Sequence, residues 1–217
     1  MAPLDPLLAN RWFARQPQAL RVALATSGRA ISLAPGQWVY GEGDDATGLV
    51  MVLDGLLRLE ATVGERNVLV GVARAGGSFG QSQRRGGGPR IVTARAGPAS
   101  RVVTVSDAAL ERIGADHSIM WQAVSELVYA QLDASVHGLA QMLALPPRAR
   151  IAARLMLFAD ERVVPLAQSD LAELCGLSRK AANTHLAALE AAGAIRRGYG
   201  AIHLLDRAML GRILDAA

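Results

Sequence analysis

The spacing of apolar residues divides the chain into regions with different periods. Over residues 31–105 the apolar residues come in short runs, such as 49–53, separated by turn residues such as Gly and Asp at 41–45. Short strands punctuated in this way are typical of an antiparallel sheet with tight connections. We therefore predict an antiparallel β-roll here, with a short helical segment over residues 3–24 lying against it.

From residue 117 to residue 145 the apolar period becomes that of a helix, and no proline interrupts it. This helix carries two apolar rows. One row contains Val128, Leu132, Val136, Leu139 and Leu143, and the other contains Met120, Val124, Leu127, Gln131, Ala134 and Gly138. A helix that packs on one core needs a single stripe, so we predict that the second row meets the same row of another subunit. The alternative is one broad stripe buried within a single chain.

Two prolines, Pro146 and Pro147, follow this helix. Proline removes a backbone donor and restricts the residue before it, so the helix is expected to end here. We predict three parts, which are a sensor domain over residues 1–116, a dimerisation helix over 117–145 and a C-terminal domain over 146–217. A chain of 217 residues that is 51% apolar is large enough for two compact cores.

The C-terminal part shows the spacing of two short helices that share one core. The apolar positions with this spacing are Leu171, Leu174, Leu177, Ala182, Leu186 and Leu189. Gly176 falls where a tight turn needs a positive φ, and Ser178 falls where the second helix needs an N-cap. This combination predicts a helix-turn-helix. Ala167 departs from it, because Ser or Thr at this first cap would contribute about 1 kcal/mol.

The front of the second helix is cationic. Arg179 and Lys180 lie in its first turn, where each positive charge opposes the helix dipole at a cost of about 0.3–1 kcal/mol. An anionic partner would offset that cost, and DNA is this partner in helix-turn-helix proteins. The alternative is two solvated charges on an exposed turn. The sequence of residues 193–205 then predicts a β-hairpin, or wing, that contacts phosphates. The tip of this wing is expected to carry Arg196, Arg197 and Tyr199.

Composition narrows the function classes further. The net charge is only +4, and Lys180 is the single lysine among 23 basic residues, so the position of charge is more informative than its sum. No stretch approaches the roughly 18 apolar residues of a membrane span, and we expect a cytoplasmic protein. Cys175, the only cysteine, is expected to be a buried structural thiol. One cysteine and four histidines are too few for a zinc, haem or iron–sulfur site, so no such metal site is predicted. The sequence contains no nucleophile elbow, Walker loop or metal pair, so we do not expect an enzyme.

Residues 166–189 and the following hairpin resemble the DNA-binding domain of the cyclic AMP receptor protein and FNR family, and the roll and long helix match that family in the same order. The resemblance implies an α+β fold with an N-terminal β-roll of the cyclic-nucleotide-binding type, a long dimerisation helix and a C-terminal winged helix-turn-helix. It also implies a homodimer that binds a two-fold symmetric double-stranded DNA site and contacts RNA polymerase. The residues expected at the DNA are Gln168, Ser178, Arg179, Lys180, Thr184, Arg196, Arg197 and Tyr199.

Individual positions of the recognition helix agree with the family only in part. Ser178 and Arg179 match the positions that contact a phosphate and read a guanine. Lys180 and Thr184 replace the glutamate and the arginine of the cyclic AMP receptor protein. The operator sequence of that protein therefore does not transfer to this chain.

The roll contains the turn signature of the family, but its phosphate-binding cassette, over residues 76–91, is altered. The predicted pocket consists of Gly80, Gln81, Arg90, Ile91, Ala134 and Ser135. Gln81 stands where the family has a ribose-binding glutamate, and Ile91 stands where it has a phosphate-binding hydroxyl residue. Losing a charge-assisted contact and a hydroxyl contact costs several kcal/mol, on the order of 2–5, so cyclic AMP should bind poorly.

These changes leave several interpretations of the roll open. We expect a small effector other than cyclic AMP, and neither haem nor an iron–sulfur cluster. The alternatives are a constitutive DNA binder with a non-functional pocket, a cyclic-nucleotide-responsive regulator, or a regulatory module that acts on a partner protein. Arg84 and Arg85 of the cassette indicate either an anion site or, more commonly for such a pair, a solvated loop.

Overall fold

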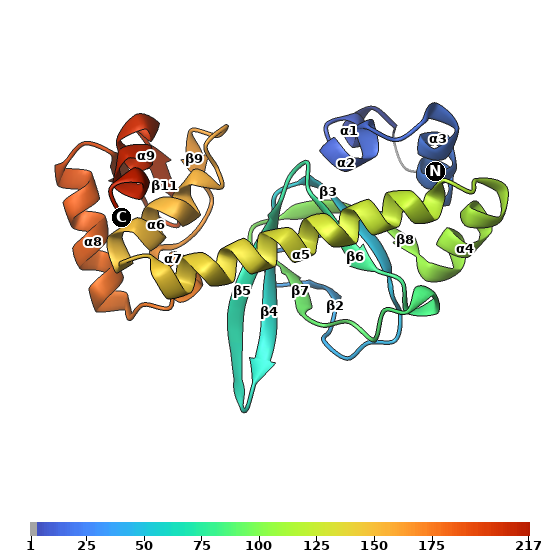
Figure 1. The fold of residues 1–217 in the computed structure, drawn as a ribbon, viewed down its shortest axis with the longest axis horizontal. Helices are drawn as coiled ribbons and strands as arrows, with labels where there is room; N and C mark the ends of the chain where they lie inside the picture. The colour runs from blue at the N-terminus through green and yellow to red at the C-terminus, as the bar shows by residue number, and fades with distance from the viewer. Residues whose placement is uncertain (1–3) are drawn as a thin grey trace. The chain divides into compact units, whose positions relative to one another are not determined.

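The computed structural model describes residues 4–217, with side chains from residue 6 onward, and it divides the chain into two compact units, Met1–Asp133 and Ala134–Ala217 (Figure 1). Residue 3, with which the predicted helical segment begins, lies outside the described residues. The rest of that segment forms α1 (Leu4–Leu8), α2 (Arg11–Ala14) and α3 (Gln18–Ser27). No helix in the described part of the chain is long and apolar enough to cross a membrane.

The first unit contains the predicted antiparallel roll, built from two four-stranded sheets. One sheet has the order β1 (Arg29–Leu33), β8 (Ser100–Ser106), β3 (Gly48–Asp54) and β6 (Ser78–Gln81). The other has the order β2 (Trp38–Tyr40), β7 (Thr93–Ala96), β4 (Leu56–Val63) and β5 (Arg66–Arg74). Neighbouring strands run antiparallel in both sheets. The fold class predicted from the sequence is therefore confirmed for this unit.

Strand β3 is buried on both faces, which explains its uninterrupted apolar run. Its side chains alternate, as they must in a strand. Val50 and Val52 join a core between the sheets, together with Phe79 and Val102. Leu49 and Met51 point the other way, into a second core beneath the helices.

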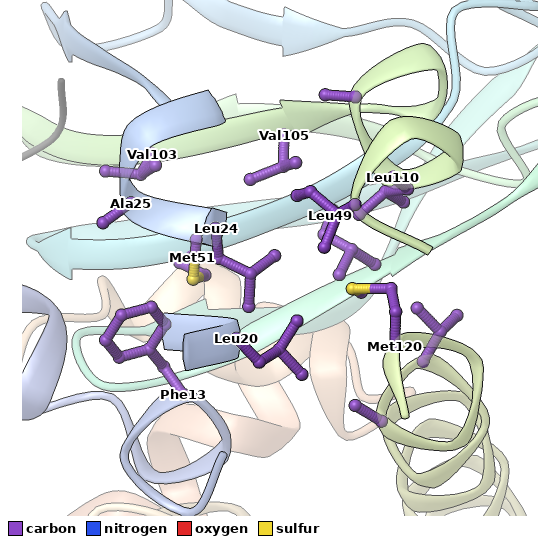
Figure 2. Close-up of a cluster of buried hydrophobic side chains, with 14 of the residues drawn as sticks. Phe13, Leu20, Leu24, Ala25, Leu49, Met51, Val103, Val105, Leu110 and Met120 are labelled. Atoms are coloured by element: carbon purple, nitrogen blue, oxygen red, sulfur yellow. The ribbon is translucent and has the colours of Figure 1, made fainter. Parts of the chain in front are cut away.

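The second core joins the sheet to the helices of the first unit (Figure 2). It contains Phe13, Leu20 and Leu24 from the N-terminal helices, and Leu110 from α4 (Asp107–Asp116). Figure 2 shows Met120, the first residue of the long helix, pointing into the same cluster. The N-terminal helices are thus an integral part of the core of this unit.

The long helix α5 (Met120–Ala144) corrects the predicted dimer row. Met120, Val124 and Leu127 are 0%, 6% and 4% exposed, because they pack into the core of their own unit. A residue buried in this way is not available to a second subunit, so the row that we expected at the dimer interface is an intrachain contact along this part of the helix. The opposite row is exposed, and it consists of Val128, Leu132, Val136, Leu139 and Leu143.

The later members of the predicted dimer row also face their own chain or solvent. Gln131 binds the backbone of Gly80 in β6, donating from Nε2 to the carbonyl oxygen at 3.0 Å and accepting the N–H at 3.1 Å. Gly138 lies next to Arg154, whose Nη2 donates to the Gly138 carbonyl at 3.3 Å. Ala134 is exposed. The division between the two units falls within α5, after Asp133, rather than at either end of the helix.

The second unit is a small helical domain with a three-stranded sheet. It begins with the end of α5, from Ala134 onward, and continues with α6 (Pro147–Met156), α7 (Gln168–Leu174), α8 (Arg179–Ala191) and α9 (Arg207–Asp215). The sheet has the order β10 (Ile195–Arg197), β11 (Ile202–Leu204) and β9 (Val163–Val164). Helices α7 and α8 followed by the β10–β11 hairpin form the predicted winged helix-turn-helix.

Candidate nucleic-acid interface

The turn between α7 and α8 is built from the residues that the sequence indicated. Gly176 has a φ of +61°, a conformation that favours glycine. The Leu177 N–H donates to the Ala172 carbonyl at 2.9 Å, which closes the end of α7. Ser178 caps α8, since its Oγ accepts the Ala181 N–H at 3.2 Å. The predicted positive φ and the predicted cap are both confirmed.

The start of α7 has the predicted defect. Ala167 occupies the N-cap in an extended conformation, and no side chain caps the helix. Cys175 lies at the other end of α7 and is fully buried, with burial raising the pKa of its thiol to about 11. A buried neutral thiol is a poor nucleophile, so Cys175 has the structural role expected from the sequence.

Helix α8 has a buried face and an exposed face that differ in chemistry. Ala182, Leu186 and Leu189 are fully buried. The polar residues of its front half are exposed, and they are Arg179, Lys180, Asn183 and Thr184. No acidic residue lies in the first turn to balance the two cations. The core residues therefore hold a cationic, solvent-facing helix front in place.

A hollow of about 320 Å³ separates the front of α8 from the wing. Its lining consists of Gln168, Ser169, Arg179, Asn183, Gly198, Tyr199 and Gly200. The structure thus brings together three residues of the predicted DNA-binding set, which are Gln168, Arg179 and Tyr199. Lys180, Thr184 and Arg196 lie outside this lining.

Sequence reasoning missed Ser169 and Asn183, which also line this hollow. Asn183 lies four residues after Arg179, and residues at that spacing are neighbours on one helix face. The spacing alone was therefore sufficient to identify Asn183. Ser169 follows Gln168 in the first turn of a seven-residue helix, and only the fold brings it to α8.

The wing differs from the prediction in the placement of its arginines. Its turn is closed by the Gly198 N–H, which donates to the Ala201 carbonyl at 2.9 Å, so the tip consists of residues 198–201. Tyr199 lies at this tip and is fully exposed. Arg196 and Arg197 belong to strand β10 instead. The expectation that both arginines lie at the tip was wrong, because the register places the turn after Arg197.

Arg197 is also bound within the chain. Its Nε and Nη2 each lie 2.7 Å from Oε2 of Glu190 in α8, and its backbone N–H donates to Oε1 at 2.7 Å. The backbone and side-chain hydrogen bonds from Arg197 lower the pKa of Glu190. Arg196 is exposed on the same strand. Of the two arginines, only Arg196 has a side chain directed at solvent rather than at a carboxylate of the domain.

The cassette of the roll is closed by its own contacts. Gly80 has a φ of +136°, and a Cβ at this position would collide with the carbonyl oxygen of Gly48 on the neighbouring strand. Gly80 is thus required for close strand contact. The side chain of Gln81 donates from Nε2 to the Gly88 and Pro89 carbonyls, each at 2.7 Å. This amide holds the cassette loop where the family has a ribose-binding carboxylate.

Arg90 is likewise occupied by the roll. It is 7% exposed, and it donates from Nη1 to the Gly48 carbonyl at 2.8 Å and from Nε to the Ala46 carbonyl at 3.2 Å. Its guanidinium also lies 4.0 Å above the centre of the Tyr40 ring. Ile91 is 72% exposed and carries no hydroxyl. At these two positions the structure thus shows a guanidinium engaged within the roll and an exposed side chain without a hydroxyl.

The remaining predicted pocket residues lie in the other unit. Ala134 and Ser135 are exposed positions of α5, in the unit that begins at Ala134. Within the first unit, the structure brings together Gly80, Gln81 and Arg90 in and beside the cassette. The polar groups of Gln81 and Arg90 donate hydrogen bonds to backbone carbonyls of the roll.

The arginine pair of the cassette is more ordered than a solvated loop. Arg85 donates from Nε and Nη2 to the two carboxylate oxygens of Glu111, each at 2.9 Å, and its guanidinium lies 4.2 Å above the Trp121 ring. The Arg84 N–H donates to Asp107 Oδ2 at 3.0 Å. The cassette is thereby tied to both α4 and α5.

Comparison with known proteins agrees with this architecture. A family model described as a Crp-like helix-turn-helix domain matches residues 149–213, and one described as a cyclic nucleotide-binding domain matches residues 30–117. The chain belongs to the Crp/Fnr family. Like other members of this family of transcription regulators, this Crp/Fnr chain combines the two domains in that order.

Individual relatives of this Crp/Fnr chain are distant in sequence. It is 27% identical over 185 residues to the HTH-type transcriptional regulator Cmr of Mycobacterium tuberculosis, a match that covers 85% of this chain and 76% of that protein. FixK2 from Bradyrhizobium japonicum has the same fold, with a TM-score of 0.76 at 18% identity over 86% of this chain and 96% of that one. A CRP-family transcriptional regulator from Thermus thermophilus gives a TM-score of 0.71 at 24% identity, over 86% of this chain and 97% of that one.

Proposed function

We propose that this Crp/Fnr regulator is a sequence-specific DNA-binding protein that reads bases with the front of α8. The observation that carries the proposal is the position of Arg179, which is exposed at the uncompensated N-terminus of α8 and faces the wing across the hollow. An arginine in this position of a recognition helix can donate two hydrogen bonds to a guanine edge. Arg196 and Tyr199 of the wing supply contacts to the DNA backbone.

The active form in this proposal is a homodimer. Along α5 the exposed apolar residues recur at alternating intervals of three and four, which is the spacing of a coiled-coil seam. They are Tyr129, Leu132, Val136, Leu139 and Leu143, and they are 56–80% exposed. A second copy of the same helix fits this stripe by two-fold symmetry, and a two-fold dimer presents two α8 helices to a symmetric site. Contact with RNA polymerase, and action in the bacterial cytoplasm, follow from the family as further parts of the proposal.

The effector in this proposal is a small molecule other than cyclic AMP. Gln81, at the ribose-binding position of the family, and Arg90, at its phosphate-binding position, are bound to backbone carbonyls of the roll. Effectors differ among proteins of this fold, since the CLP regulator of Xanthomonas campestris, at a TM-score of 0.68 and 18% identity, is described as responsive to c-di-GMP. The cationic front of α8 favours the proposed DNA-binding function over that of a regulatory module that acts on a partner protein, because such a module does not require a cationic recognition helix.

The base-reading role is tested by comparing two arginine variants. Arg179→Ala should lose about 1–3 kcal/mol of binding free energy on the preferred site and relax the preference at one base pair. Arg196→Ala should weaken all sequences alike and lower the salt slope by about 1. Fluorescence anisotropy on the preferred site and its single-base variants, across a salt series, separates the two. Equal weakening of every sequence by Arg179→Ala would contradict the placement of the recognition helix.

A constitutive DNA binder is the second candidate, favoured by the internal hydrogen bonds of the cassette. In either case cyclic AMP should raise the melting temperature little, because a ligand stabilises a protein only in proportion to its binding to the folded state. A saturable rise at micromolar cyclic AMP, measured by differential scanning fluorimetry, would contradict this expectation. DNA affinity measured with and without c-di-GMP and other candidate ligands distinguishes a regulated protein from a constitutive one.

A further inference from the structure

The recognition helix and the wing are joined by one charged pair. Glu190, in the last turn of α8, accepts two hydrogen bonds from Arg197 of β10, one from the backbone N–H to Oε1 and one from Nε to Oε2, each at 2.7 Å. Nη2 of Arg197 also lies 2.7 Å from Oε2 as part of the ion pair. We call this contact the Glu190–Arg197 clamp. The backbone and the side chain of Arg197 each bind a different oxygen of one carboxylate, so the contact fixes orientation in addition to distance. Hydrogen bonds to an ionised group are also stronger than those between neutral groups.

The clamp acts on the edge of the wing sheet. Strand β10 pairs only with β11, so its other side has no strand partner among the described residues. The carboxylate of Glu190 takes the place of such a partner for the Arg197 N–H. The start of β10 is held by the buried side chain of Ile195 and by the Ala194 N–H, which donates to the Leu189 carbonyl at 3.0 Å. The end of β10, next to the wing tip, is held by its pairing with β11 and by the clamp.

The position of the clamp connects it to the hollow. Arg197 immediately precedes Gly198, and Gly198, Tyr199 and Gly200 line the wing side of the hollow. Arg179 and Asn183 line the opposite side, and they belong to the same helix as Glu190. The clamp therefore ties the two walls of the hollow to one helix.

We propose that Glu190 and Arg197 are positioning residues for DNA binding, which hold the wing tip at the distance from α8 at which a DNA strand fits the hollow. This inference rests on the proposed DNA-binding function. It assigns Arg197 to the clamp rather than to a phosphate, and it means that an acidic residue, Glu190, strengthens the binding of a polyanion.

Electrostatics alone predicts the opposite effect of Glu190. A carboxylate close to the DNA repels phosphates and neutralises Arg197, so its removal should tighten binding and steepen the salt dependence. If the clamp positions the wing, its removal should weaken binding, because the wing loses its phosphate contacts. The sign of the change thus distinguishes the two accounts.

The experiment measures the affinity and salt slope of the full chain on its preferred DNA site. Glu190→Ala should weaken binding on the order of tenfold and lower the salt slope by about 1, as expected for one lost wing contact to a phosphate. Arg197→Lys keeps the charge but not the planar fork, so it should also weaken binding, whereas Arg196→Lys should change it little. Asp215→Asn, at the end of α9, controls for removal of one negative charge from the same domain.

Tighter or unchanged binding by Glu190→Ala would overturn the inference, as would unchanged binding by Arg197→Lys. Melting temperatures identify a variant that fails to fold, and Arg197→Lys, which keeps a cation facing Glu190, then decides the question alone. The outcome is separable from that of the proposed function. If the unaltered protein binds without sequence preference and Arg179→Ala has no effect, the function itself is contradicted. If Arg179→Ala abolishes the preference and Glu190→Ala tightens binding, only the clamp is contradicted.

Discussion

At the scale of single residues, the first unit is organised by one buried carboxylate that the sequence did not single out. Asp107, the first residue of α4, accepts hydrogen bonds from Thr47 Oγ1 at 3.0 Å, from Ser82 Oγ, and from the Arg84 N–H at 3.0 Å. Burial alone would raise the pKa of Asp107, but these hydrogen bonds outweigh it and lower the pKa. Asp107 therefore ties the cassette and the start of β3 to α4.

We predict that Asp107→Asn destabilises the first unit by about 2 kcal/mol at pH 7, because an amide replaces an acceptor of three hydrogen bonds. The lowered pKa sets the pH dependence. An aspartate in the unfolded chain has a pKa of about 3.9, and the pKa of Asp107 in the folded protein is lower. The unaltered protein should therefore have a larger free energy of unfolding than Asp107→Asn above that pH. This difference should disappear as the pH falls through the pKa of folded Asp107. Urea unfolding at pH 7 and at pH 3 measures this. A difference between the two proteins that grows on acidification would contradict the assignment.

The residue scale also shows where sequence reasoning is reliable. Gly176 and Ser178 could be assigned because a tight turn and a helix cap depend on the local backbone, and the structure confirms both. Arg90 and Asp107 could not be placed in this way. Their partners lie 23 to 60 residues away along the chain, so only the fold determines whether a polar side chain is buried or free.

At the scale of elements, helix α5 shows the limit of a periodic pattern. The 3.6-residue period revealed two apolar rows, but a period carries no information on which row faces the core. The core beneath the N-terminal helices takes the row that contains Leu127, and the row that contains Leu132 stays exposed. The wing shows the same limit, because the hairpin was recognised while its register, and hence the position of Arg197, was not.

We predict that Leu132→Asp and Leu127→Asp separate dimerisation from folding. Leu132 is 56% exposed, so a charge there should dissociate the dimer without unfolding the protomer. The melting temperature of this variant should be near that of the unaltered protein at concentrations where the unaltered protein is monomeric. Leu127 is 4% exposed, so a charge there should cost more than about 3 kcal/mol of folding free energy. Sedimentation equilibrium and thermal unfolding measure the two effects. A dimer of full affinity with Leu132→Asp would contradict the proposed seam.

At the scale of the whole molecule, the order of the parts was the strongest information in the sequence. A roll, a long helix and a winged helix-turn-helix occur in that order in the structure, and the two family models match the corresponding residues. The pattern of turns and periods sufficed for this because each part has its own repeat along the chain. The effector could not be predicted in the same way, because the cassette departs from the family at Gln81 and Ile91 and its sequence indicates no particular new ligand.

The central claim is that a two-fold dimer reads DNA through α8, and the most direct test is selection of bound sequences from a random double-stranded pool by the full-length protein. We predict enrichment of an inverted repeat whose half-sites lie about 10–10.5 base pairs apart, or a multiple of that distance, since each recognition helix enters the major groove on one face of the DNA. The same selection with Arg179→Ala should lose one base preference in both half-sites together. Enrichment of an asymmetric sequence, or none at all, would contradict the account.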